Sequence, residues 1–258
     1  FKLEITHNIN QIKLNIFDFK IKSLCESQGE VIAVGTKSSD IIEIHSAEKI
    51  KVVMRGHYFG DLTGLAMHPF QGVFYTVGED HMLGVWEISG KKQLNLEKIE
   101  YPAKCIAISN DGKLLAIGCK NGHVLIRDSK SMSLVCDLKD RQSEVNCIRF
   151  STNNEKLAVA YGHPDCEIFL YSAKGTFKPE VKFRGSLATT THMDFSIDGK
   201  VIQLNNAGEE LIFFDTTSGK RITTPSDIRD TKWQSYSCIN GFPCLSIHKN
   251  WSQIMDNK

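Results

Sequence analysis

The sequence lacks any long hydrophobic run. Its longest apolar stretches cover only a handful of residues, whereas a membrane-spanning helix needs about 20. The first residues also contain no apolar core of a signal peptide. We therefore expect a protein with no membrane partner.

An excess of charge of one sign is also missing. Lys and Arg total 31 and Asp and Glu total 30, which leaves a formal net charge of +1. Without a net field, the protein has no general attraction to nucleic acid or anionic lipid, so we expect no nucleic-acid partner. Hydrophobic residues at 41% and charged residues at 24% are near globular averages, so the chain is expected to fold.

Paired cysteine motifs do not occur. The eight cysteines are scattered through 258 residues, and none forms a C-x-x-C pair. In a chain of this length, such spacing is typical of reduced core thiols and not of a disulfide framework. We therefore expect a cytoplasmic protein.

Catalytic and cofactor motifs are absent too. The patterns G-x-S-x-G, H-E-x-x-H and G-x-G-x-x-G do not occur. Residues 163–166 contain three potential metal ligands, but a metal site needs converging ligands from elsewhere, and a polar turn explains them more simply. We expect no catalytic residue, no cofactor, no metal and no small-molecule substrate, and hence no enzyme.

What the sequence does contain is an internal repeat. Five stretches share an apolar strand, a polar turn and a second apolar strand, over residues 30–46, 72–89, 113–129, 155–172 and 200–216. Their closing positions are His45, Trp86, Arg127, Tyr171 and Phe214, which are 41, 41, 44 and 43 residues apart. A period of about 40–45 residues with four short strands per unit is typical of a β-propeller.

The turns of the repeat favour strands over helices. Asn110–Lys113, Asn153-Asn154 and Asp198-Gly199 each fall between the first and second strands of a unit. Asx and Gly residues supply the positive φ that a tight hairpin needs. The fold class is therefore predicted to be all-β, without helices.

One unit carries a set of polar residues that resembles the WD repeat. Gly56-His57 precedes the first strand, Thr76 lies on the second, and Asp80 stands six residues before Trp86. In such a set the buried indole, hydroxyl, imidazole and carboxylate satisfy one another, because a buried carboxylate without partners is costly. We expect these residues to be structural rather than catalytic, in this one blade only.

Two segments resemble, more narrowly, the echinoderm microtubule-associated protein-like family. Residues 55–69 match the family's repeat at Gly64, Leu65, His68 and Pro69, although Thr63 replaces the usual Trp. Residues 233–243 match its Trp-aromatic-Cys-Gly segment at Trp233, Cys238, Gly241 and Pro243. Residues 245–249 then depart from the family's Gly-Ile/Val-Trp-Pro. The resemblance covers residues 18–243.

The whole chain is expected to form one partial WD-repeat β-propeller, over residues 1–258. The expected units are 1–17 (a partial strand), 18–57, 58–100, 101–142, 143–187, 188–232 and 233–258 (the start of a further blade). Five units and parts of others leave a ring short of strands, so the propeller is expected to be incomplete in this chain. Residues 1–17 and 245–258 are candidates for strands of the missing blade.

The resemblance implies a non-enzymatic interaction scaffold of the cytoskeleton, with tubulin or microtubules as partner. Propeller loops gather at the two faces of a rigid disc and can present many side chains to a large partner. Because tubulin is acidic and this chain has almost no net charge, we expect binding by these residues alone to be weak.

Two alternatives remain open. A general WD-repeat adaptor would hold a short peptide on the face that carries Tyr58, His81, Asn121 and His163. An enzyme on a propeller scaffold would need titratable groups that converge in the central channel.

Overall fold

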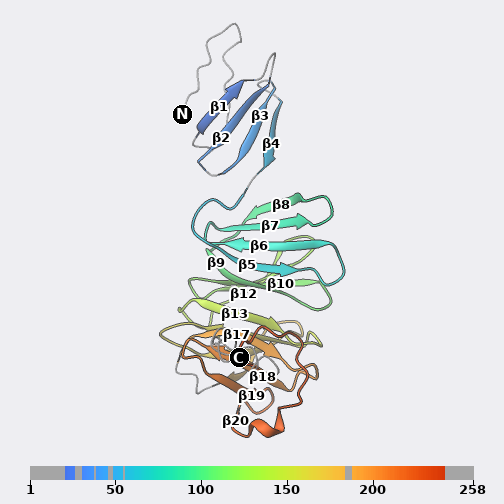
Figure 1. Cartoon of the computed structure of the whole chain (residues 1–258), viewed down its shortest axis with the longest axis vertical. Helices are drawn as coiled ribbons and strands as arrows, with labels where there is room; N and C mark the ends of the chain where they lie inside the picture. Colours follow the sequence, from blue (N-terminus) through green and yellow to red (C-terminus); the bar gives the residue numbers. More distant parts are fainter. Residues whose placement is uncertain are drawn as a thin grey trace, which may run out of the picture.

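A computed structural model describes residues 21–26, 31–37, 39–45, 49–54, 56–183 and 188–241. Twenty strands form five antiparallel sheets of four, and strands adjacent in sequence are neighbours in every sheet (Figure 1). The predicted all-β, partial β-propeller is confirmed, and we call the sheets blades 1–5. The described residues contain one helical element, a 3-10 turn at Pro225–Asp227. No helix among them is long and apolar enough to cross a membrane.

The strands of each blade follow one another along the chain. Blade 1 contains β1 (Ile21–Glu26), β2 (Ile32–Thr36), β3 (Ile41–Ile44) and β4 (Ile50–Met54). Blade 2 contains β5 (Leu62–Met67), β6 (Val73–Gly78), β7 (Met82–Glu87) and β8 (Lys92–Lys98). Blade 3 contains β9 (Ala103–Ile108), β10 (Leu114–Cys119), β11 (Val124–Asp128) and β12 (Leu134–Leu138). Blade 4 contains β13 (Val145–Phe150), β14 (Lys156–Tyr161), β15 (Ile168–Ser172) and β16 (Pro179–Phe183). Blade 5 contains β17 (Thr190–Phe195), β18 (Val201–Asn206), β19 (Leu211–Asp215) and β20 (Arg221–Ile222).

The hairpins between first and second strands have the predicted backbone. Gly112, Asn154 and Gly199 have φ values of 73°, 59° and 70°, in the left-handed region that glycine and asparagine tolerate best. The prediction of Asx and Gly turns at these three places is confirmed.

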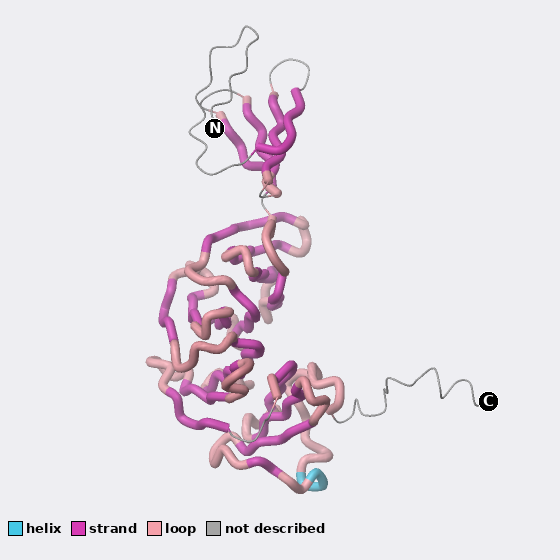
Figure 2. Tube along the Cα trace, turned by 90° about the vertical axis from the view of Figure 1, so that its left-hand side faces the viewer, coloured by secondary structure: helices cyan, strands magenta, loops and turns pink. Residues whose placement is uncertain are grey.

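Blades 2–5 follow one another around an open curve (Figure 2). Their first strands β5, β9, β13 and β17 contact one another in series. Each of these strands has a register shift at its second residue, where one extra residue enters the ladder. Because the shift is repeated, the polypeptide enters each of these four blades with the same strand register.

The hydrophobic core of blades 2–5 lies between the sheets. One cluster joins Val77 of blade 2 to Ile117 of blade 3, and a second joins Ile126 of blade 3 to Leu157 of blade 4. A third joins Leu170 of blade 4 to Leu204 of blade 5. Each blade therefore depends on its neighbour for burial, as expected for a quasi-linear stack.

Blade 1 stands apart from this stack (Figures 1 and 2). Its buried cluster contains only Ile32, Val34, Ile42 and Ile44, all from β2 and β3. Both outer strands, β1 and β4, are exposed wherever their side chains are described. Blade 1 therefore shares no hydrophobic cluster with blade 2 among the described residues.

One predicted closing position was wrong. Ile44, and not His45, occupies in blade 1 the place of Trp86 in blade 2, because Ile44 pairs with Ile32 as Trp86 pairs with Phe74. His45 lies just beyond β3, where its backbone N–H donates to the Lys49 carbonyl at 3.0 Å and closes the turn.

Candidate functional site

In blade 2, the four side chains of the predicted network form one chain of hydrogen bonds. His57 Nδ1 lies 2.9 Å from Asp80 Oδ2, and His57 Nε2 lies 2.9 Å from Thr76 Oγ1. The indole N–H of Trp86 donates to the same hydroxyl at 2.7 Å. These hydrogen bonds join the segment before the first strand of blade 2 to its second and third strands, β6 and β7.

The Asp80 carboxylate, whose side chain is 0% exposed, is surrounded by donors from the protein itself. Besides His57, it accepts from the backbone N–H of Tyr58 at 3.2 Å and of Met82 at 3.1 Å. A buried carboxylate with three such partners is stabilised in place and has no open side for a substrate. The geometry supports the structural interpretation of these residues.

A glycine makes room for this network. A Cβ atom at Gly84 would lie 2.5 Å from Thr76 Oγ1 and 2.6 Å from Trp86 Nε1, which is too close for any side chain. The indole also stacks on Phe74 with ring centroids 6.1 Å apart. The local sequence therefore fits one arrangement of the Trp86 side chain.

In blade 3 the equivalent place contains an ion network. Arg127 has the register position in β11 that Trp86 has in β7. Its guanidinium donates to Glu100 at 2.7 and 2.8 Å, to Glu97 at 3.0 Å and to the Met132 carbonyl at 2.7 Å. Burial raises the pKa of Glu100, but the hydrogen bonds and charge of Arg127, together with a backbone hydrogen bond, outweigh it and the net shift is downward.

In blade 4 the same place contains tyrosines. The Tyr171 hydroxyl donates to Asp140 Oδ2 at 2.5 Å and lies 3.2 Å from the Tyr161 hydroxyl. Burial raises the pKa of both phenols, that of Tyr161 to about 12. Sequence reasoning identified Arg127 and Tyr171 as equivalent positions but missed their acidic partners, which lie about 30 residues earlier in the chain.

Thr63 and Gly64 of the family motif lie where blades 2 and 3 meet. A Cβ atom at Gly64 would lie 2.7 Å from Val77 Cγ2 and 3.1 Å from the Ile106 backbone nitrogen. Thr63, the residue that departs from the family pattern, donates through its hydroxyl to the Ala103 carbonyl at 3.0 Å. Threonine therefore links the two blades by a hydrogen bond at this position.

The other motif residues of blade 2 lie on β5 and in the turn that follows it. His68 Nδ1 accepts from the backbone N–H groups of Phe70 and Gln71, at 3.2 and 3.1 Å, which holds the turn that contains Pro69. Leu65 is exposed on β5.

The second family segment packs against blade 5. Trp233 is buried and stacks on Phe213 with centroids 6.1 Å apart, and Cys238 is buried as well. The Gly241 N–H donates to the Cys238 carbonyl at 3.0 Å. Pro243 lies outside the described residues, as do residues 1–17 and 245–258.

Hydrogen bonds to Asp194 of blade 5 hold this segment in place. Its buried carboxylate accepts from the Ser235 hydroxyl at 2.5 Å, from the N–H and hydroxyl of Ser237 at 3.1 and 2.7 Å, and from the Cys238 N–H at 3.0 Å. Burial raises the pKa of Asp194, but these hydrogen bonds outweigh it and the net shift is downward. Sequence reasoning missed this residue, because Asp194 and its partners lie 41–44 residues apart and no local pattern links them.

Four thiols lie within the stack, of which Cys105 is partly buried and the other three are buried. Burial raises the pKa of Cys105, Cys119, Cys147 and Cys238, that of Cys119 to about 12. Such thiols are protonated at neutral pH and are poor nucleophiles and poor metal ligands. In the described part of the chain, no group of three or more His, Cys, Asp or Glu side chains is arranged to hold a metal.

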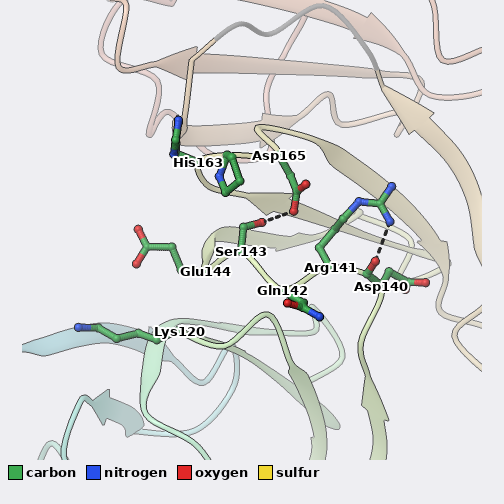
Figure 3. Close-up of a pocket in the computed structure, with 9 residues that line it drawn as sticks. Lys120, Asp140, Arg141, Gln142, Ser143, Glu144, His163 and Asp165 are labelled. Carbon is green, nitrogen blue, oxygen red and sulfur yellow. Dashed lines mark hydrogen bonds between the residues drawn. The ribbon is translucent and has the colours of Figure 1, made fainter.

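The four candidate partner-binding residues lie at one end of their blades. His81, Asn121 and His163 occupy turns between the second and third strands of blades 2, 3 and 4, and Tyr58 precedes the first strand of blade 2. Tyr58 and His163 are exposed. Of the four, His163 lines a groove of about 740 Å³ where blades 3 and 4 meet (Figure 3).

The groove is polar and contains charges of both signs. It is lined by Lys120, Asp140, Arg141, Gln142, Ser143, Glu144, His163, Pro164 and Asp165. Lys120 comes from the turn after β10, residues 140–144 from the connection between β12 and β13, and residues 163–165 from the turn after β14. Among these residues, sequence reasoning named only His163 as a partner-binding candidate, because the three loops meet only in the folded stack.

Comparison with known proteins identifies the chain as part of one family. The model of the second β-propeller of echinoderm microtubule-associated protein matches residues 62–258. Over 239 residues, or 92% of this chain, the sequence is 30% identical to the 77 kDa echinoderm microtubule-associated proteins of Lytechinus variegatus and Strongylocentrotus purpuratus. It is 27% identical over 240 residues to echinoderm microtubule-associated protein-like 3 of Mus musculus.

The chain spans only part of these relatives, 36% and 34% of the two sea-urchin proteins and 26% of the mouse protein. The family match begins at the first residue of β5, so blade 1 lies outside the range assigned to the second propeller. Blades 2–5, by contrast, lie entirely within that range. The chain belongs to the echinoderm microtubule-associated protein family, and its residues 62–258 match the second β-propeller of that family.

Proposed function

We propose that this chain is a non-enzymatic interaction scaffold that takes part in the association of its parent protein with microtubules. The observation that carries the proposal is the match of residues 62–258, which form blades 2–5 and the segment packed against them, to the second propeller of a microtubule-associated family. In this proposal the protein lies in the cytoplasm on the cytoskeleton, and its direct partner is tubulin in the polymer.

The structure supports a scaffold in two ways. Clusters that span neighbouring blades make the stack stiff, so loops at the blade ends are presented with little ordering cost. The polar groups that sequence patterns offered for chemistry, above all Asp80 and His57, are occupied in hydrogen bonds within blade 2.

We propose that the partner-facing side is the end of the blades that contains Tyr58, His81, Asn121 and His163. The side chains of Tyr58 and His163 are exposed there on different blades, so a large partner could contact both at once. A general adaptor for short peptides is the second candidate, favoured by the groove beside His163.

Co-sedimentation with polymerised tubulin tests the proposal. The 258-residue chain and a longer form with both propellers are compared at low and moderate salt, and a double variant Tyr58→Ser, His163→Ser is compared with the unchanged chain. We expect the longer form to pellet, the chain to pellet more weakly and in a salt-sensitive way, and the variant to pellet least. If both lengths remain in the supernatant, the microtubule proposal is wrong.

A further inference from the structure

The groove between blades 3 and 4 has a charge arrangement that the scaffold proposal does not use. We propose that it binds a short peptide segment through an arginine or lysine side chain, with the carboxylates of Glu144 and Asp165 as the main contacts. The inference rests on the second candidate function, the peptide adaptor, whose ligand it specifies, and it stands even if the chain fails to bind polymer.

Both cations of the groove are already paired with carboxylates. Lys120 forms an ion pair with Glu79 of blade 2, and the hydrogen bond between them raises the pKa of Lys120. Arg141 Nε donates to Glu167 Oε2 at 2.6 Å, and its guanidinium lies over the Phe169 ring, 4.8 Å from the centroid. An anionic ligand would have to compete with these carboxylates.

Glu144 and Asp165 have few hydrogen-bond partners, unlike the third carboxylate of the groove, Asp140, which accepts from the Tyr171 hydroxyl. Asp165 accepts one hydrogen bond, from the Ser143 hydroxyl at 2.7 Å, and Glu144 Oε2 lies 3.6 Å from Lys104 Nζ. A carboxylate has room for about four donors, so both side chains keep free acceptor positions. Figure 3 shows Glu144 and Asp165 on either side of Ser143, so a peptide lying across the groove would pass both carboxylates.

The remaining lining suits a peptide. Gln142 and His163 are exposed at the rim, and no hydrogen bond to either side chain occurs in the described part of the chain. An amide side chain offers both a donor and an acceptor to a peptide backbone. The volume of about 740 Å³ exceeds that of one side chain and leaves room for the adjoining residues of an extended segment.

Arginine fits the carboxylates better than lysine. Its planar guanidinium has five donors and pairs with carboxylates in two parallel hydrogen bonds, whereas an ammonium acts as a point charge. A peptide with arginine is therefore favoured over one with lysine.

Fluorescence anisotropy with three labelled nine-residue probes tests the proposal on the full chain. The first probe alternates arginine with glycine and serine, the second has citrulline at each arginine position, and the third has glutamate. We expect the arginine probe to bind about 10-fold more tightly than the citrulline probe, since charged hydrogen bonds are lost without a change of shape. The glutamate probe should bind least.

A pair of matched variants locates the site. Glu144→Gln and Asp165→Asn together should weaken the arginine probe about 10-fold, while each amide keeps the shape and the Ser143 acceptor. Glu155→Gln is the control, because Glu155 is also a half-exposed glutamate with one lysine partner, Lys174, but lies outside the groove. The control should leave affinity unchanged.

Three results would overturn the proposal. One is equal affinity, or no binding, for the arginine and citrulline probes. Another is an equal loss of affinity in Glu155→Gln and in the groove variant. The third is tighter binding of the glutamate probe, which would assign the groove to an acidic ligand held by Lys120 and Arg141.

Discussion

Blade 1 and blades 2–5 share a strand order but differ in where their apolar side chains lie. In blade 1 the buried cluster is confined to β2 and β3, whereas the clusters of blades 2–5 extend from one sheet to the next. A four-stranded sheet has two faces, and each must be covered for its apolar residues to be buried. The comparison shows that the neighbour, and not the blade itself, supplies most of the burial.

The first strands of blades 2–5 show the same dependence on a neighbouring blade at one register position. Leu65 on β5 is 62% exposed, whereas Ile106, Ile148 and Met193 at the equivalent register positions are 5%, 1% and 0% exposed. Blades 3, 4 and 5 each have a preceding blade packed over this face. Among the described residues, no blade packs over this face of blade 2 (Figure 1), and Leu65 is exposed there.

The largest expected effect tests the internal network of blade 2. Trp86→Ala should lower the free energy of unfolding by about 3–5 kcal/mol, because it opens a cavity and removes a donor from Thr76. Trp86→Phe keeps most of the packing with Phe74 and should cost about 1–3 kcal/mol. Urea unfolding measures both, and an unchanged stability in Trp86→Phe would show that the indole N–H contributes nothing.

Two equivalent positions sharpen the comparison between covered and uncovered faces. Ile148→Ala should cost about 2–5 kcal/mol, since it removes buried atoms between two blades. Leu65→Ala, at the same register position on β5, should change stability by less than about 0.5 kcal/mol. A large loss in Leu65→Ala, measured in the same urea titration, would mean that another part of the chain covers β5 in solution.

Asp194 provides a test at the other end of the stack. Asp194→Asn should cost about 1–3 kcal/mol at neutral pH, because the charged acceptor of Ser235 and Ser237 is lost. The pKa of Asp194 is depressed in the folded state, so its contribution is fully present above the unfolded pKa of about 4 and is lost as the pH falls through the folded pKa. The difference in stability between the two proteins should therefore shrink below about pH 4. A difference that stays constant with pH would contradict the role of the charge.

The smallest effect concerns blade 1. Val34→Ala should cost about 1–2 kcal/mol, and only within blade 1, because its cluster is not shared with blade 2. Hydrogen exchange should show faster exchange in β2 and β3 and unchanged protection in β9 and β10. Loss of protection throughout blades 2–5 would show that blade 1 and the stack unfold together.

Much of the fold could be predicted from local patterns. The period between Trp86 and Arg127 and the turn at Gly112 are properties of short segments, so they fixed strands, turns and repeat number before any packing was known. The closing position of blade 1 was wrong by one residue, because strand pairing and not spacing sets the equivalence of Ile44.

The polar networks of the candidate site could be predicted only in part. The network of His57, Thr76, Asp80 and Trp86 spans only 30 residues and follows a known pattern, so its members could be named. The partners of Arg127 and Asp194 could not, since they depend on which loops of neighbouring blades meet.

The sequence by itself determined an all-β repeat, the family to which it belongs and the polar set of one blade, because these depend on residue order within about 40 positions. Tertiary structure alone decided which apolar faces are covered, which carboxylate holds residues 235–238, and where Lys120, Ser143 and Asp165 converge. The physical reason is that burial and charge pairing depend on distances in space between blades, and a chain position does not specify these until the sheets stack.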